Sequence, residues 1–88
     1  MRDRPEESRY ELLVDGRPAG LISYRMSGKA IALLHTEVDA AYEGQGLGSR
    51  LIAAALQDAR QRGLVVEPRC PFVASYLERH PEDRDLIV

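Results

Sequence analysis

The sequence of 88 residues has a single cysteine, Cys70, and no long apolar run. One cysteine excludes an internal disulfide framework and a cysteine-based zinc site. The apolar stretches are too short to span a bilayer, so we expect no membrane partner. The first ten residues, MRDRPEESRY, lack the apolar core of a signal peptide. We therefore expect a cytoplasmic protein.

The sequence also has little net charge, since 12 Lys and Arg stand against 14 Asp and Glu. A net charge of −2 gives no general attraction for nucleic acid. No cluster of Lys and Arg is interleaved with aromatic residues, as a base-stacking surface requires. We expect no nucleic-acid partner and no metal site.

The composition, 44% hydrophobic and 30% charged, is typical of a soluble globular protein. The length predicts a single domain over 1–88, in which we expect residues 1–8 to be flexible. Alternating apolar residues and two glycine-containing turns predict three consecutive strands, at 9–14, 19–26 and 31–38. Short turns between them indicate an antiparallel meander.

The second half of the chain predicts a helix at about 47–62, a short strand at 64–68 and a second helix at 71–80. The last eight residues, PEDRDLIV, predict a turn and a short terminal strand. A strand that returns after a helical crossover lies parallel to the strand before it. The predicted fold class is therefore α/β (α+β): an antiparallel three-strand meander, a helix, a parallel strand and a helix.

The segment YEGQGLGSRL, residues 42–51, places three glycines between the third strand and the first helix. Such a loop can turn several backbone N–H groups toward one point, and the helix behind it adds the positive end of its dipole. An anion such as a phosphate or pyrophosphate is then the predicted ligand. The alternative is a strand-to-helix turn whose glycines only relieve strain and allow close packing.

VDAAYEGQGLGSRLIAAAL resembles the acyl-coenzyme A loop of the GNAT superfamily of N-acetyltransferases, whose pattern is Arg/Gln-x-x-Gly-x-Gly/Ala. Gly46 and Gly48 match its glycines, but Glu43 stands where the family prefers Arg or Gln, and a carboxylate there should weaken pyrophosphate binding unless it points away. HTEV and RCPFVASYLERHPE are similar to segments of a small single-domain group in that superfamily. The resemblance covers 10–85 and implies a minimal GNAT-like fold.

The resemblance implies that the chain binds acetyl-CoA and transfers its acetyl group to an amine acceptor. It further implies that backbone groups near 37–39 hold the pantetheine and the carbonyl, and that 44–49 hold the pyrophosphate. The implied cofactor-binding residues are Val38, Asp39, Glu43, Gly44, Gln45, Gly46, Leu47, Gly48 and Ser49.

Two residues of the third strand are candidate bases. Glu37 could deprotonate the amine directly or through water, or be an ordinary exposed carboxylate. His35 lies two residues away on the same strand face and titrates in a useful range, and its alternative is a partly buried structural histidine. Both are predictions of catalytic residues.

Two further candidates lie in the second helical segment. Tyr76 fits the place where many superfamily members carry a tyrosine that protonates the coenzyme A sulfur, and core packing is its alternative. Cys70, beside Arg69 at a helix start, could form a stabilised thiolate and accept acetyl, or be a small buried residue.

Compared with full-length acetyltransferases, the chain lacks the N-terminal helices and C-terminal strands that usually build the acceptor site. The first hypothesis, from the resemblance, is a minimal N-acetyltransferase that acts on a small molecule or a protein. The second, from these missing elements, is a non-catalytic module that binds acyl-coenzyme A or a partner protein. A third is an interaction scaffold with a purely structural loop. Exposed sheet edges would allow a homodimer.

Overall fold

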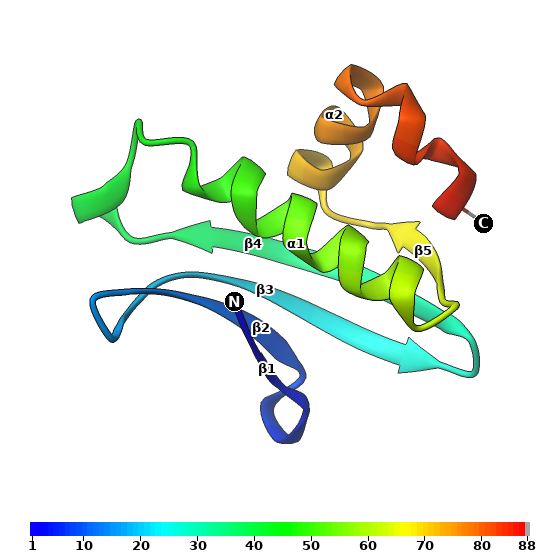
Figure 1. Ribbon diagram of the computed structural model, residues 1–88, viewed down its shortest axis with the longest axis horizontal. Helices are drawn as coiled ribbons and strands as arrows, with labels where there is room; N and C mark the ends of the chain where they lie inside the picture. The colour runs from blue at the N-terminus through cyan, green and yellow to red at the C-terminus, as the bar shows by residue number, and fades with distance from the viewer. Residues whose placement is uncertain (88) are drawn as a thin grey trace.

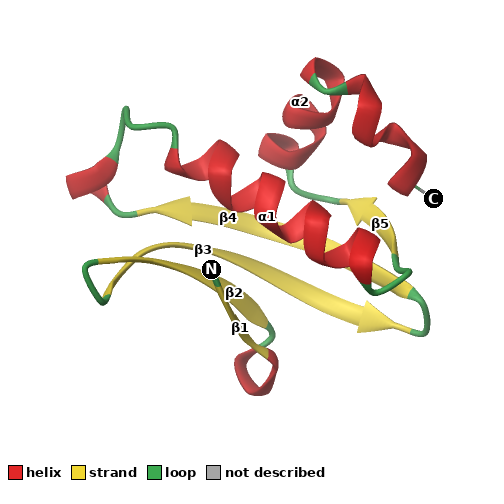
Figure 2. Ribbon diagram, in the orientation of Figure 1, coloured by secondary structure: helices red, strands yellow, loops and turns green. Residues whose placement is uncertain are grey.

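Five strands form one sheet in the order β1-β2-β3-β4-β5 (Figures 1 and 2). The structure is a computed structural model and describes residues 1–87. The strands are β1 (Arg2–Arg4), β2 (Arg9–Val14), β3 (Arg17–Ser27), β4 (Ala30–Val38) and β5 (Val65–Pro68). The first four pair antiparallel, and β5 pairs parallel with β4. The predicted meander and the parallel crossover are confirmed.

Two α-helices and three short 3₁₀ helices complete the fold. The α-helices are α1 (Leu47–Gln61) and α2 (Pro71–Arg79). The 3₁₀ helices are η1 (Pro5–Glu7), η2 (Ala40–Tyr42) and η3 (Pro81–Leu86). Helix α1 lies along the sheet, and α2 follows β5 beside it (Figure 1). Within residues 1–87, no helix combines the length and the apolar character needed to cross a membrane.

The register gives the sheet two different faces. Tyr10, Ile22 and Thr36 stand opposite one another on β2, β3 and β4, and the Tyr10 hydroxyl reaches Asp58 on α1. Residues paired in this way share a face, so this is the helix face. The next row is Glu11, Leu21 and Glu37, which therefore belongs to the opposite, helix-free face.

The core lies between the helix face and the two α-helices. One contiguous cluster joins buried side chains of β2 to β5, α1, α2 and η3. The apolar positions of α1 recur at helical spacing and are buried there, so the periodicity that predicts this helix also predicts its buried side. The largest side chains that are almost fully buried there are Tyr10, Ile22, Ile31, Leu33, Leu51, Ile52, Leu56, Val66 and Val73.

Both ends of the chain differ from the sequence prediction. Residues 1–8, expected to be flexible, contain β1 and η1, and β1 pairs along β2. The sheet therefore has one strand more than predicted, because ion pairs hold a strand that has no apolar pattern. At the C-terminal end, η3 occupies 81–86, and the predicted terminal strand is reduced within the described residues to Ile87, which bridges parallel to Val66 on β5.

Candidate active site

Strands β4 and β5 separate half-way along β4. Their pairing covers only Ala30 to Leu33. The Leu33 carbonyl then accepts hydrogen bonds from the N–H groups of Arg69 and Cys70, at 3.1 and 3.0 Å, and the chain turns into α2. In the part of the chain that the structure describes, residues 34–38 have no strand partner on this edge. Free backbone groups thus line a gap in the sheet.

The glycine loop enters α1 beside this gap. Gly44 and Gly46 have φ of 82° and 73°, a conformation that side chains disfavour, and nothing lies within 4 Å of where a Cβ would stand. Gly46 is the N-cap of α1 and provides no side-chain cap. Among residues 1–87, none of the N–H groups of 44–49 donates a hydrogen bond. Six free donors at the positive end of a helix suit an anion.

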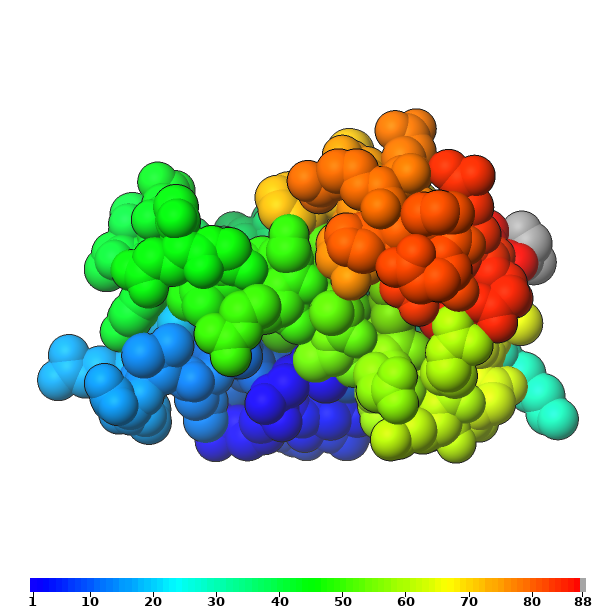
Figure 3. All heavy atoms as spheres, turned by 45° about the horizontal axis from the view of Figure 1, so that its top comes forward, coloured from blue at the N-terminus to red at the C-terminus, as the bar shows by residue number. Residues whose placement is uncertain are grey.

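The third glycine has a packing role. A Cβ on Gly48 would stand 3.0 Å from Cζ of Phe72 and 3.5 Å from Cγ2 of Val38. At Gly48, therefore, the absence of a side chain allows close packing, which is the alternative to ligand binding stated above. The contact places the start of α2, the start of α1 and the end of β4 together. In Figure 3 a hollow separates the green surface of the loop from the gold and orange surface of α2.

Cys70 lies at the N-cap of α2, on the helix side of the gap. The residue is 4% exposed, and its Sγ lies 3.6 Å from Oγ1 of Thr36. Burial raises the pKa of the Cys70 thiol, but the Thr36 hydroxyl and the N–H groups of Val73, Phe72 and Thr36 outweigh it, so the net pKa lies below its usual value. The low exposure of Cys70 agrees with the alternative that it is a small buried residue. The lowered pKa agrees with the hypothesis that it forms a stabilised thiolate.

The two candidate bases lie on the other face of β4. Nε2 of His35 is 3.4 Å from Oε1 of Glu37, and their side chains are 60% and 61% exposed. The pair shares a strand face, as the sequence predicts. The alternative of a partly buried structural His35 is wrong, because the bulge at Leu34 turns the strand so that His35 faces solvent. Thr36 lies between them and points the opposite way, toward Cys70.

Tyr76 is packed against the end of α2. Its ring stacks on His80 with centroids 3.8 Å apart, and it belongs to the core cluster. Burial, followed by the charges of Asp83 and Glu82, raises the pKa of its hydroxyl. These surroundings favour core packing. No contact of Tyr76 in the described residues supports the predicted role of its hydroxyl as a proton donor to the coenzyme A sulfur.

The structure thus divides the predicted residues between three places. The gap beside β4 gathers Val38, Cys70 and the loop 44–49, whereas Glu37 and His35 project from the far face and Tyr76 packs at its own helix end. Asp39 caps η2 by accepting from the Ala41 N–H at 2.9 Å, and Glu43 is exposed.

Thr36 and Phe72 are additional residues of this site. The first contacts the thiol, and the second contacts the glycine helix start. The only signal for Thr36 in the sequence is its alternation with His35 and Glu37, because its partner is 34 residues away along the chain. Phe72 is an aromatic residue left 46% exposed beside a predicted loop.

Comparison with known proteins gives the family. A family model described as GCN5-related N-acetyltransferase matches residues 9–86. This chain belongs to the GCN5-related N-acetyltransferase family. In this family member the matched region starts with β2 and ends with η3, so it contains every part of the site described above.

Three solved structures share the fold. A GCN5-like protein from Staphylococcus aureus, assigned as an N-acetyltransferase, has a TM-score of 0.73 at 26% identity over 93% of this chain and 82% of its own. Ard1 from Thermoplasma volcanium has a TM-score of 0.58 at 28% identity, over 69% of this chain and 43% of its own. The Escherichia coli ribosomal-protein-S18-alanine N-acetyltransferase has a TM-score of 0.65 at 22% identity, over 84% of this chain and 50% of its own. The chain therefore spans half or less of the two larger enzymes.

Proposed function

We propose that this GCN5-related N-acetyltransferase transfers acetyl from acetyl-CoA to an amine. One observation carries the proposal: the six free N–H groups of 44–49 lie next to the free edge of β4 at 34–38. The contact among Gly48, Phe72 and Val38 joins these two features. A loop of donors and an unpaired strand edge together suit a ligand that has both an anionic end and an amide-bearing arm.

The residues present fit acetyl-CoA. The N–H groups of 44–49 and the dipole of α1 would bind the pyrophosphate. The backbone of Val38, on the free edge, would pair with the pantetheine amides, as an added strand does at an open sheet edge. The backbone of Asp39 is already paired, since its N–H donates to the Ala19 carbonyl at 2.8 Å and its carbonyl accepts from the Tyr42 N–H at 2.9 Å. The exposed carboxylate of Glu43 would reduce the affinity, and solvent would screen part of its charge. When bound, acetyl-CoA supplies an activated thioester.

Glu37 would take the proton of the attacking amine. Its carboxylate points to the helix-free face, so an amine that approaches from that face meets the base before it reaches the edge of β4. His35, at 3.4 Å, would orient the carboxylate or pass the proton to solvent. These two side chains and Cys70 lie on opposite faces of β4, so they do not act on the same proton.

Cys70 would have a separate role on the helix face. Its thiolate would attack the carbonyl of acetyl-CoA and form an acetyl–Cys70 thioester, and the coenzyme A thiolate that leaves would take a proton from solvent. The deprotonated amine would then attack this thioester, and the Cys70 thiolate would leave. Intact-mass measurement after incubation with acetyl-CoA tests this step. An acetyl adduct on the wild type that is missing from Cys70→Ala supports it, and transfer without an adduct, retained in Cys70→Ala, would contradict it.

The transfer itself is tested by following the release of coenzyme A from acetyl-CoA with a panel of amines. We expect release that depends on the amine, and a fall in kcat of roughly 10²- to 10³-fold in Glu37→Gln, because general base catalysis contributes about that much. Glu78→Gln, an exposed change on α2, is the matched control. If the protein binds acetyl-CoA but no amine of the panel causes release of coenzyme A, the protein is a binding module and not a transferase.

A further inference from the structure

The helix-free face of the sheet contains a cavity of 480 Å³ beside the candidate base. Its walls come from three strands and include Arg9 and Glu11 of β2, Leu21 of β3 and Glu37 of β4, with Asp39 just beyond. Glu11, Leu21 and Glu37 form one row across the sheet. Since neighbouring strands lie about 4.8 Å apart, the two glutamates are about 10 Å apart at their Cα atoms. The volume suits a small molecule.

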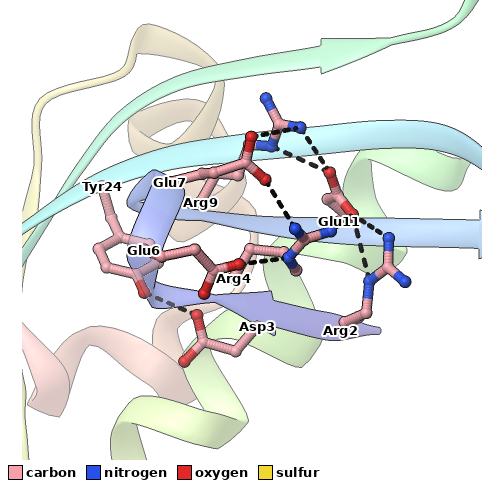
Figure 4. Close-up of polar contacts among 8 residues, drawn as sticks. All are labelled: Arg2, Asp3, Arg4, Glu6, Glu7, Arg9, Glu11 and Tyr24. Atoms are coloured by element: carbon pink, nitrogen blue, oxygen red, sulfur yellow. Dashed lines mark hydrogen bonds and ion pairs between the residues drawn. The ribbon is translucent and has the colours of Figure 1, made fainter.

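One wall of this cavity is fixed by an arginine–glutamate cluster that consists of Arg2, Arg4, Arg9, Glu6, Glu7 and Glu11 (Figure 4). Glu11 lies at its centre with 4% of its side chain exposed, and it accepts from Arg2 at 2.5 Å and from Arg9 at 2.8 Å. The side-chain hydrogen bond from Arg2 lowers the pKa of Glu11. The cluster contains three guanidinium groups and three carboxylates, so the positive and negative charges of this wall balance each other.

The opposite wall carries uncompensated negative charge. Glu37 contacts His35, and Asp39 accepts only a backbone N–H among the residues that the structure describes. No guanidinium or ammonium group faces either carboxylate within ion-pair distance in residues 1–87. Between the two walls lie Pro18 and Leu21, which present apolar surface. The cavity is thus polarised, with anionic groups at β4 and an apolar floor.

We propose that this cavity binds the acceptor, and that the acceptor is a small primary amine with a short aliphatic stem that arrives as a cation. The ammonium group binds at Glu37 and Asp39, and the stem lies on Leu21. Glu37 then removes the proton, and the neutral amine lies next to the free edge of β4. The reaction in this inference rests on the proposed function, and the choice of ligand rests on the residues that line the cavity.

The test uses n-butylamine as the probe and 1-butanol as its uncharged counterpart, followed by backbone amide shifts of the labelled protein. We expect the amine to produce saturable shifts at 19–21 and 37–39, and the alcohol to produce none there. Leu21→Arg adds bulk and positive charge in the cavity and should abolish the shifts. Leu21→Trp fills the same space without charge and should weaken them. Met26→Arg, on the same strand outside the cavity, is the control.

Kinetics separate this inference from the proposed function. We expect Leu21→Arg to raise the KM for the amine at least 10-fold while the affinity for acetyl-CoA stays unchanged, which also shows that the variant folds. Transfer with an unchanged KM in both Leu21 variants would overturn the acceptor site and leave the transferase intact. Amine shifts at 19–21 without transfer would support the site and overturn the transferase. Neither shifts nor transfer would overturn both.

Discussion

The two ends of α1 differ in how fully their polar groups are paired. At the C-terminal end, Arg60 donates to Asp85 at 2.8 and 2.9 Å, and Arg62 donates to Asp58 at 3.1 Å. At the N-terminal end, the N–H groups of 44–49 donate to no group in the described chain. One helix thus has a closed, paired end and an end with unused hydrogen-bonding capacity.

The paired end also ties the sheet to the helix. Tyr10 donates to Asp58 and Tyr24 donates to Asp3, both at 2.6 Å, and burial raises the pKa of each hydroxyl. Arg62 lies 3.8 Å from Asp3 and so connects the two pairs. The difference teaches that stability and binding are separated along one helix. Interactions that stabilise the fold cluster where no ligand is expected, and the free donors remain where one is.

The largest expected effect comes from breaking the paired end. Tyr10→Phe removes a hydroxyl that is fully buried and bonded to a carboxylate, and should lower the free energy of unfolding by about 1.5–3 kcal/mol. Ser49→Ala, at the other end, should change it by less than about 0.5 kcal/mol. Urea denaturation of both variants measures the two values. Equal losses would show that stability is not concentrated at the paired end.

A second change sharpens the difference at the free end. Glu43→Gln removes an exposed carboxylate beside the loop and should tighten acetyl-CoA binding about 5-fold at low salt, since a repulsion of about 1 kcal/mol is lost. Added salt should shrink this gain because it screens exposed charges. Isothermal titration calorimetry gives both affinities. Glu78→Gln is the control, and an affinity that does not rise would mean that Glu43 points away from the ligand.

The smallest expected effect concerns the thiol beside the free end. Because the pKa of Cys70 lies below that of an ordinary thiol, its thiolate should form at a lower pH than it would without these contacts. Alkylation by iodoacetamide followed against pH should therefore show a lower midpoint for the folded protein than for the protein unfolded in urea. Thr36→Val, which removes a hydroxyl that favours the thiolate, should move the midpoint of the folded protein upward. A folded midpoint equal to or above the unfolded one would refute this explanation.

The regular part of the fold could be predicted from the sequence. The glycines at 44–48 followed by apolar residues at helical spacing predict α1, and the crossover rule predicts the parallel β5. Strand β1 could not be predicted, because RDR has no apolar alternation and pairs through charged side chains such as Arg2 with Glu11. The bulges at Leu12/Leu13 and Ser23/Tyr24 also depend on long-range pairing.

The parts of the candidate site that depend on the local backbone could be predicted from the sequence. The parts that depend on the register between strands could not. Glycine spacing identifies the loop, and a cysteine before a proline marks the start of α2. The cavity on the helix-free face needs Glu11, Leu21 and Glu37 in one row, and the chain does not show which residues stand opposite one another until the bulges are known. Thr36 was missed for the same reason.

The most direct test of the central claim is a titration with acetyl-CoA that follows the backbone amide shifts of the wild type, Gly46→Asp and Gly28→Asp. Both glycines have positive φ with free space around them, so the two variants match in strain, but Gly28 lies in the turn before β4. We predict saturable shifts at 44–49 and near Val38 and Cys70 in the wild type and Gly28→Asp, and a loss of affinity of about 100-fold in Gly46→Asp, where a carboxylate would enter the anion site. No shifts in the wild type at millimolar acetyl-CoA, or equal affinities in both variants, would contradict the claim that the free end of α1 binds the cofactor.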